Sequence, residues 1–198
     1  MLPKSHFNAA YYKRYYESSE TAVVDAQLQQ DEVRFVIAFC RFIELEVKRF
    51  ADVGAGTGWW AREFAKQYRR CPVIETFDAS PDACEIYGHK NVAVQHLAGA
   101  ASDLVVCRDV LRYVSDTNID KAVERLAKKC RGVMYLHVIT KEDEIDEEAS
   151  DMAGVFRTTA FYRRRLKAAG FRDCGMGLFV SARFRKFTPF ALEVGRSY

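Results

Sequence analysis

The sequence predicts an α/β fold: a single-domain, doubly wound, mostly parallel seven-stranded sheet with helices on both faces and a helical N-terminal cap. Three observations carry this prediction. Apolar, strand-like runs alternate with segments of helical periodicity along most of the 198 residues. Residues 103–107 (D-L-V-V-C) are almost wholly apolar, as expected of a central parallel strand. Residues 47–53 open into a glycine-rich loop followed by a helical pattern, a geometry that brings backbone close to a nucleotide-like ligand.

Two helices are expected before the first strand. Residues 7–16 place aromatic side chains on one helical stripe, and residues 31–45 repeat apolar side chains at the spacing of a helix face. Both belong to the expected N-terminal cap, residues 1–45. The remaining residues, 46–198, are expected to form the Rossmann-like core of the same domain.

The later elements have local signals at their ends. Residues 80–82 (S-P-D) supply an N-cap, a first-position proline and a first-turn acid for a short helix that Gly88 ends. Gly132 and Gly170 are expected to end two further helices. The expected strands are 47–53, 73–77, 91–95, 103–107 and 133–138, with strand signals over 171–184 and again around 191–194 whose division into two strands stays open. The expected helices between them run from the glycine loop to before Pro72, then over 81–88, 118–130 and 158–169.

The spacing of the glycine loop, residues 54–58 (G-A-G-T-G), separates ligand classes. A dinucleotide-binding loop, G-x-G-x-x-G, needs its third glycine at position 59, which is Trp59. A phosphate-binding P-loop needs a lysine after its last glycine, and none is present. The remaining pattern is D-x-G-x-G-x-G, beginning at Asp52. The alternative is a tight turn that binds nothing.

Composition excludes several functional classes. No apolar stretch is long enough to span a membrane, and the N-terminus does not resemble a secretory signal, so a cytoplasmic protein is expected. The six cysteines form no C-x-x-C pair and the four histidines have no metal-ligand spacing, so reduced thiols and no metal site are expected. The net charge of +3 is too small to indicate nucleic acid by itself, although the C-terminal part is basic around residues 163–165.

The motifs D-V-G-A-G-T-G, T-F-D-A-S-P, D-L-V-V-C-R-D-V-L-R-Y-V and K-A-A-G-F occur in this order. With them the chain resembles the class I (Rossmann-like) S-adenosylmethionine-dependent methyltransferases over about residues 47–184. The resemblance implies S-adenosylmethionine as cofactor and methyl transfer as reaction. The Y-Y-K-R-Y-Y segment resembles the cap that many small-molecule members place over the cofactor. The segment after the fourth strand is not the N-P-P-[YFW] of enzymes that methylate adenine or glutamine amides, which favours a small-molecule acceptor.

The expected cofactor site follows from these motifs. Asp78 ends the second strand a little over twenty residues after the loop, where its carboxylate can accept both ribose hydroxyls; the alternative is an Asx turn. Family members usually have an acid after the third strand, and here Gln95 offers an amide carbonyl instead. Trp59 is either a wall against the cofactor or part of the core. The expected cofactor-binding residues are Asp52, Gly54, Ala55, Gly56, Gly58, Trp59, Asp78, Ala79, Gln95, His96, Arg108 and Tyr16.

Asp109 and His137 are the candidates for a catalytic base, which is needed only when the acceptor is a hydroxyl or a protonated amine. Asp109 follows the fourth strand at the mouth where the methyl group is presented, but it can instead cap the next turn. His137 lies late on the fifth strand, where a core histidine bonded to backbone is the alternative.

The acceptor side is expected from the cap and from the segment after the fourth strand. Tyr12 and Tyr113 are the expected substrate-binding residues, with residues 141–160 completing the pocket. On the cap helix, Tyr11 and Tyr15 are expected to pack, while Tyr12 or Tyr16 contacts the ligands. Two alternatives stay open: a methyltransferase that acts on RNA or protein through the basic residues, and a non-catalytic S-adenosylmethionine-binding domain.

Overall fold

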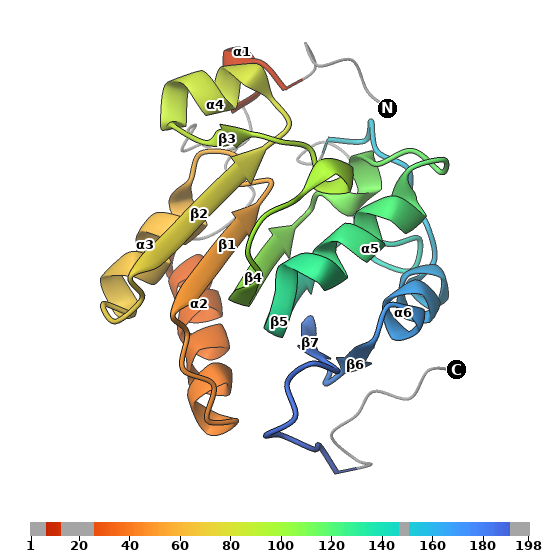
Figure 1. The fold of residues 1–198 in the computed structure, drawn as a ribbon. Helices are drawn as coiled ribbons and strands as arrows, with labels where there is room; N and C mark the ends of the chain where they lie inside the picture. The colour runs from red at the N-terminus through yellow and green to blue at the C-terminus, as the bar shows by residue number, and fades with distance from the viewer. Residues whose placement is uncertain (1–6, 13–25, 147–150, 191–198) are drawn as a thin grey trace.

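The computed structural model describes residues 7–12, 26–146 and 151–190. It contains a seven-stranded sheet in the order β3-β2-β1-β4-β5-β7-β6 (Figure 1). Strands β1 to β5 pair in parallel, and β7 pairs antiparallel with both β5 and β6. The strands are β1 Arg49–Val53, β2 Val73–Asp78, β3 Lys90–Asn91, β4 Ser102–Arg108, β5 Cys130–His137, β6 Phe171–Asp173 and β7 Leu178–Ser181. The helices are α1 Ala9–Tyr12, α2 Ala26–Phe42, α3 Trp59–Gln67, α4 Pro81–Tyr87, α5 Ile119–Lys129 and α6 Thr159–Ala168. The predicted mostly parallel sheet is confirmed.

Two hydrophobic cores cover the two faces of the sheet, because side chains alternate along each strand. On β4, Leu104 and Val106 point to the core that contains α2 and α3, whereas Val105 and Cys107 point to the core that contains α5 and α6. All four residues are fully buried. The continuous apolar run of this strand therefore reflects burial on both faces, and Figure 1 shows α2 and α3 on one side of the sheet and α5 and α6 on the other.

The chain changes direction across the sheet at β1. After β1 it proceeds outward to β2 and β3, and it then returns to β4 on the other side of β1 before continuing to β5. In open parallel sheets, ligands bind outside the carboxyl ends of the strands at such a switch point. The loops after β1 and β4 can consequently bind one ligand between them.

Local signals place α4 and α6 as predicted. The Ser80 hydroxyl accepts a hydrogen bond from the Ala83 amide, Pro81 is the first residue of α4, and Gly88 ends it with a left-handed φ of 77°. The Thr158 hydroxyl accepts from the Phe161 amide at the start of α6. These helices begin and end where their capping residues satisfy the free backbone groups.

The predicted strand 91–95 is wrong in extent. β3 covers only Lys90–Asn91, which pair with the last two residues of β2, and Val94–His96 form a short 3-10 helix. Within the described residues β3 is the edge strand and pairs only with β2. The segment turns inward and its residues line the cavity described below.

Two other expected boundaries differ. Gly132 does not end α5: the helix stops at Lys129 and β5 begins at Cys130 without a loop. A Cβ at Gly132 would lie 2.2 Å from the Asp103 carbonyl oxygen, so this glycine allows close approach of β5 to β4. The division of the strand signals over 171–184, which the sequence left undecided, is into β6 and β7. A turn that contains Gly175 and Gly177 separates the two strands.

Several expectations lie outside the described residues. The strand expected around 191–194 is one of them, and so is the part of the first helix beyond Tyr12. The second helix begins earlier than expected, at Ala26 rather than at Asp31. The boundary between a cap, 1–45, and a core, 46–198, stays a prediction.

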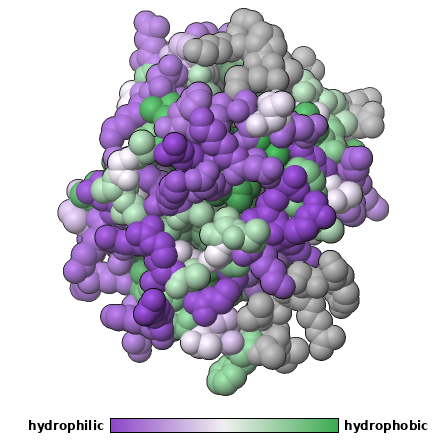
Figure 2. All heavy atoms as spheres, turned by 45° about the vertical axis from the view of Figure 1, so that its right-hand side comes forward, coloured by the Kyte–Doolittle hydropathy of each residue, from purple (hydrophilic) through white to green (hydrophobic). Residues whose placement is uncertain are grey.

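No helix of the described part of the chain is long and apolar enough to cross a membrane. The face shown in Figure 2 is largely hydrophilic, with hydrophobic residues only in small islands.

Candidate functional site

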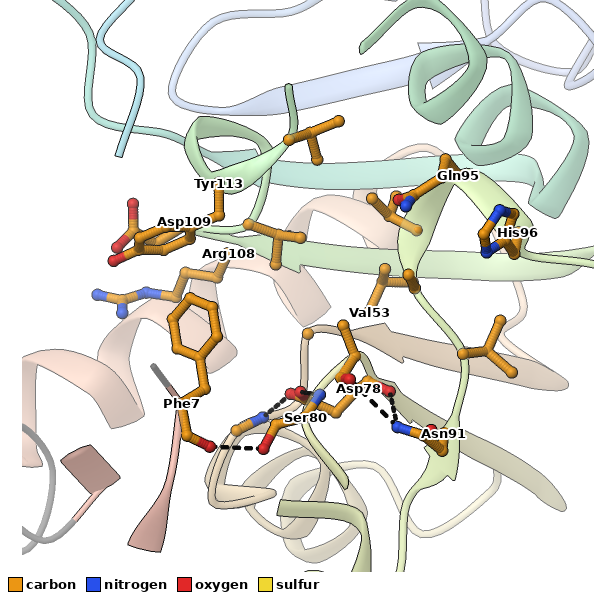
Figure 3. A pocket seen from close by; sticks show the side chains of 18 of the residues that line it. Phe7, Val53, Asp78, Ser80, Asn91, Gln95, His96, Arg108, Asp109 and Tyr113 are labelled. Atoms are coloured by element: carbon orange, nitrogen blue, oxygen red, sulfur yellow. Dashed lines mark hydrogen bonds between the residues drawn. The ribbon is translucent and has the colours of Figure 1, made fainter. Parts of the chain in front are cut away.

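A cavity of about 460 Å³ opens at the carboxyl ends of β1, β2 and β4. This volume is within the usual range of small-molecule and cofactor sites. Figure 3 shows Phe7, Arg108, Asp109 and Tyr113 at one end of the cavity and Asn91, Gln95 and His96 at the other. The cavity is lined by Phe7, Tyr11, Val53, Gly54, Gly56, Asp78, Ala79, Ser80, residues 91–96, residues 108–110, Tyr113 and Val114.

The glycine loop forms the floor beside β4. Gly54 has a φ of 74°, and a Cβ there would lie 2.1 Å from Cγ2 of Val110. The Gly54 and Ala55 amides both donate to the Phe77 carbonyl, at 2.8 and 3.0 Å. The loop therefore packs tightly on the segment after β4 while its backbone faces the cavity. Glycine is required at position 54 by conformation and by space.

We expect Gly54→Ala to lower the melting temperature by about 5–15 °C, since the left-handed conformation and the overlap with Val110 together cost several kcal/mol. The matched control is Gly99→Ala. Gly99 has a φ of 87°, and a Cβ there meets nothing within 4 Å. This control isolates the conformational part, about 1–2 kcal/mol. Equal losses in thermal denaturation of the two variants would contradict the role of the Val110 contact.

Asp78 joins the glycine loop to the start of α4. Its Oδ2 accepts the Gly56 amide at 2.9 Å, and its Oδ1 accepts the Ser80 amide at 2.8 Å. The carboxylate is 7% exposed and lines the cavity, and burial raises its pKa. Each carboxylate oxygen can accept more than one hydrogen bond, so both can also receive hydroxyls from a ligand. The Asx turn and the ligand-binding role are thus compatible in this residue.

Asp52 lies beneath the loop at the end of β1. The carboxyl group is 3% exposed, and no group of the described residues donates to its Oδ2. Burial raises its pKa to about 7. A buried oxygen without a hydrogen-bond donor destabilises the folded state. It indicates that a ligand group or a bound proton provides the missing donor.

Asp109 presents a carboxylate at the end of the cavity that also contains Phe7, Arg108 and Tyr113. It follows β4 directly in the left-handed region, with a φ of 54°, and its amide donates to the His137 carbonyl at 2.7 Å. Its Oδ1 forms an ion pair of 2.7 Å with Nε of Arg112, whose side chain is only 3% exposed. Burial raises the pKa of Asp109, and Arg112 opposes this effect. The unusual backbone conformation is held by β5 on one side and by the buried arginine on the other.

The roof of the cavity comes from the N-terminal segment. Phe7 packs edge-to-face on Tyr11 and on Tyr113, with ring centroids 5.1 and 4.9 Å apart. The Ser80 hydroxyl donates to the Phe7 carbonyl at 2.6 Å. The Tyr11 and Tyr113 hydroxyls lie 3.3 Å apart, and the Tyr113 hydroxyl donates to Oδ2 of Asp151 at 3.0 Å. Tyr11, Tyr113 and Asp151, which are far apart in the sequence, thus meet at the Tyr113 hydroxyl.

Arg108 is the cationic residue at the same end (Figure 3). Its Nε donates to Oε1 of Glu32 on α2 at 3.2 Å. The cavity wall therefore carries a positive charge at Arg108 next to a negative charge at Asp109. The α2 helix contributes to the site indirectly, by holding Arg108.

Nine predicted site residues line the cavity: Gly54, Gly56, Asp78, Ala79, Gln95, His96, Arg108, Asp109 and Tyr113. Five others do not line it: Asp52, Ala55, Gly58, Trp59 and His137. Trp59 packs partly buried against the core that contains α2, and a Cβ at Gly58 would touch His89 and Arg62 instead of entering the cavity. The His137 side chain is exposed and does not line the cavity, and its carbonyl accepts a hydrogen bond from the Asp109 amide.

Of the cap tyrosines, Tyr11 packs against Phe7 as expected and also lines the cavity. The side chain of Tyr12 and the whole of Tyr16 lie outside the described residues, so their expected contacts stay predictions.

Several lining residues were missed by sequence reasoning. Phe7 and Ser80 were identified for packing and capping, but they also build the cavity wall. Val110 follows Asp109 in the motif after β4, and its contact with Gly54 could have been inferred from the pairing of β1 with β4. Asp151 lies within residues 141–160, which were expected to complete the pocket, but its hydrogen bond with Tyr113 had no local signal in the sequence.

The sequence over residues 26–174 matches the family of the methyltransferase domain. Among curated proteins, the malonyl-[acyl-carrier protein] O-methyltransferase of Gallionella capsiferriformans is 31% identical over 85 residues, which are 43% of this chain and 29% of that protein. The chain thus matches less than a third of the length of this relative.

Solved structures share the fold. Magnesium protoporphyrin IX methyltransferase from Synechocystis PCC 6803, with bound S-adenosylmethionine, has a TM-score of 0.67 at 18% identity and covers 90% of this chain and 94% of that one. An amino pentose methyltransferase from Micromonospora echinaspora has a TM-score of 0.59 at 20% identity and covers 77% of this chain and 90% of that one. Since the family match extends over more than half of the chain and these folds agree, the predicted resemblance is confirmed, and the protein belongs to the class I S-adenosylmethionine-dependent methyltransferase family.

Proposed function

We propose that this protein binds S-adenosylmethionine in the cavity at the carboxyl ends of β1, β2 and β4 and transfers its methyl group to a small-molecule acceptor. The observation that carries the proposal is the enclosure of one cavity by the glycine loop, Asp78 and Asp109 under a roof of Phe7 and Tyr11. The relatives named above are called methyltransferases of a carrier-bound malonyl group, a porphyrin and an amino sugar, which supports a small-molecule acceptor.

The residues present fit this cofactor at three points. The lone pairs that Asp78 keeps toward the cavity suit the ribose hydroxyls. The glycine loop presents backbone to the cavity at Gly54 and Gly56, and Gly54 packs too closely on Val110 for a side chain. The orphaned Oδ2 of Asp52, below the loop, suits the ammonium group at the amino-acid end of the cofactor.

At the far end, Gln95 faces the site where many members of the family have an acid. It is 2% exposed and lines the cavity together with His96. An amide can accept a hydrogen bond from an adenine amino group as a carboxylate does, although without its charge. We therefore assign the residues 94–96 to the adenine and the residues 108–113 to the reacting end.

The reacting end needs alignment more than acid catalysis. When bound, S-adenosylmethionine supplies an electrophilic methyl group on a sulfonium whose leaving group is a neutral thioether. The chain aligns the acceptor at about 3–3.5 Å from this methyl group and excludes water, which is worth several kcal/mol. Phe7, Tyr11 and Tyr113 form the apolar walls for this alignment.

Asp109 is the residue assigned to the acceptor proton. Its carboxylate lines the cavity, and the buried Arg112 orients it. A hydroxyl or ammonium acceptor donates a hydrogen bond to this carboxylate and can lose its proton to it. The His137 carbonyl holds the Asp109 amide at 2.7 Å, and its imidazole, which does not line the cavity, is the less favoured candidate for the base.

A macromolecular acceptor has less support. Two of the three arginines of α6 that suggested it are engaged within the chain: Arg163 forms an ion pair with Asp173 at 2.8 Å, and Arg165 with Asp120 at 2.6 Å. Salt-dependent RNA binding would favour that alternative. A non-catalytic S-adenosylmethionine-binding domain has only the replacement of the usual acid by Gln95 in its favour.

Thermal denaturation tests the cofactor. Ligand at about 100 times its dissociation constant adds roughly 2.7 kcal/mol to the free energy of unfolding, a shift of about 5–10 °C for a chain of this size. We expect S-adenosylmethionine and S-adenosylhomocysteine to raise the melting temperature by this amount and NAD to leave it unchanged. The absence of a shift with the first two ligands would contradict the proposed site.

Incubation with methyl-labelled S-adenosylmethionine and fractionated cell extract tests the acceptor class. The label is expected in the small-molecule fraction, and the Asp109→Asn variant is expected to transfer it at least about tenfold more slowly, the lower part of the usual contribution of a base. Label in RNA or protein would favour the macromolecular alternative. Cofactor binding without any transfer would favour the non-catalytic one.

A further inference from the structure

The outer face of α2 carries an apolar stripe that the fold leaves uncovered. Leu28, Phe35 and Phe42 are 64%, 40% and 71% exposed. They recur at intervals of seven residues, which places them on one line along a helix. Large apolar side chains that are exposed singly are ordinary, but three on one helical line form a contiguous surface.

Phe39 of α2 and Phe187 beside the helix widen this stripe. Phe187 packs edge-to-face against Phe39 and against Phe42, with ring centroids 6.3 and 6.4 Å apart. We call the five residues of this surface the α2 patch: Leu28, Phe35, Phe39, Phe42 and Phe187.

The core does not include the three side chains of the stripe, Leu28, Phe35 and Phe42. The opposite face of α2 is anchored by Val33, Val36, Ile37, Cys40 and Ile43, each at most 3% exposed. Phe39 and Phe187 pack partly buried against this core at the edge of the stripe. The other large exposed apolar residues of the described chain lie on separate elements, as Ile86 does on α4 and Met176 in the turn before β7. The stripe therefore has an origin other than the packing of the domain.

Charges beside the stripe are arranged with opposite signs at its two ends. Asp31, in the N-terminal half of α2, is about half exposed. Arg41, in the last turn of α2, is exposed, and exposed Arg185 and Lys186 adjoin Phe187 at the same end. A partner that is acidic where this helix is basic, and basic where it is acidic, matches this layout. A second copy of the same helix, running antiparallel, has that arrangement.

We propose that the α2 patch is the interface of a homodimer, in which α2 of a second copy packs antiparallel across a two-fold axis near Phe35. Such an isologous interface needs a surface that is complementary to itself. Phe35 is midway between Leu28 and Phe42, so Leu28 of one copy meets Phe42 of the other. Phe35 packs against its own equivalent at the axis.

The same register pairs the charges. Asp31 lies four residues before Phe35 and Arg41 six residues after it, on the same flank of the helix. At 1.5 Å per residue, their positions along an antiparallel pair differ by about 3 Å, within reach of these side chains. Asp31 also forms an ion pair of 2.7 Å with Arg34 of its own chain, which keeps its carboxylate on that flank.

The interface adjoins the cavity without including it. Glu32, the residue after Asp31, holds Arg108 in the cavity wall at 3.2 Å. A dimer built on α2 would stabilise the helix from which Glu32 projects. The proposal does not depend on the proposed methyl transfer, because it concerns mass in solution and holds whether or not a cofactor binds.

Multi-angle light scattering after size exclusion, over about a hundredfold range of concentration, tests the proposal. The wild type is expected to reach twice the chain mass of 22.7 kDa. Phe35→Asp and the milder Phe42→Ser are expected to shift the protein to monomer. Ile86→Asp, at a residue 54% exposed on α4, is the matched control that should remain dimeric. Circular dichroism shows whether each variant is folded.

A charge exchange tests the antiparallel register. Asp31→Arg and Arg41→Asp are each expected to weaken the dimer by about tenfold or more, and their combination is expected to restore it. A monomeric wild type at the highest concentration overturns the proposal, as does a dimer that survives in folded Phe35→Asp and Phe42→Ser. A double variant that stays as weak as the single ones overturns the antiparallel pairing.

Discussion

Replacing Asp78 with alanine is expected to weaken S-adenosylhomocysteine binding by at least about a hundredfold. Two charge-assisted hydrogen bonds to the ribose are lost, each worth about 1.5–3 kcal/mol. The variant also loses the acceptor for the Gly56 and Ser80 amides, so its melting temperature should fall without ligand. Isothermal titration calorimetry gives the dissociation constant.

Two substitutions separate binding from folding. Asp78→Asn keeps an acceptor oxygen for one of the two backbone amides, so it should retain more stability than Asp78→Ala while still losing most of the affinity. Asp82→Ala removes an exposed carboxylate from the first turn of α4, four residues away, and should bind as the wild type does. Unchanged affinity in Asp78→Ala would remove this residue, and the ribose assignment, from the site.

Asp52→Asn is expected to make the ligand-free protein more stable at pH 8. Burial raises the pKa of Asp52 in the folded protein to about 7, against 3.8 for an unperturbed aspartate. The folded state thus holds a proton that the unfolded state releases, so stability falls as pH rises through the interval between these values and the full penalty is present above about 7. At about 1.4 kcal/mol per unit of pKa, the penalty amounts to a few kcal/mol.

Melting curves of wild type and Asp52→Asn at several pH values measure this effect. The difference should be small near pH 4 and should reach roughly 5–10 °C at pH 8. Asp103→Asn is a control of opposite sign, because Arg131 and the Lys48 and Arg49 amides lower the pKa of Asp103 despite its burial. That variant should lose stability at pH 8. If Asp52→Asn melts below the wild type at pH 8, the carboxylate is stabilised by a group that the described residues do not provide.

The features that the sequence predicted well are those determined by interactions between residues that are close in the sequence. The apolar run of β4, the cap of α4 and the glycine loop each depend on residues within a few positions of one another. Asp78 and Asp109 were found for the same reason, since each directly follows a strand whose carboxyl end meets the site.

The features that were missed depend on distant contacts. Among the described residues β3 is the edge strand of the sheet and pairs only with β2, which no local pattern reveals. Tyr11 and Tyr12 share a helix, and its docking against Tyr113 decides that Tyr11 faces the cavity. Arg112 was not identified from the sequence, and it is 2% exposed because Asp109, Tyr113 and the Asp151 carbonyl surround its guanidinium.

The roof over the cavity has a consequence for synthesis. Phe7 and Tyr11 leave the ribosome well before Tyr113, the partner of Tyr11, which follows 102 residues later. Contacts of such sequence separation form late, after the loops between them have closed. The nascent chain is therefore expected to complete its central strands before it closes this cavity, so a chain shortened by its first dozen residues should still assemble the sheet but hold its cofactor in an open cleft.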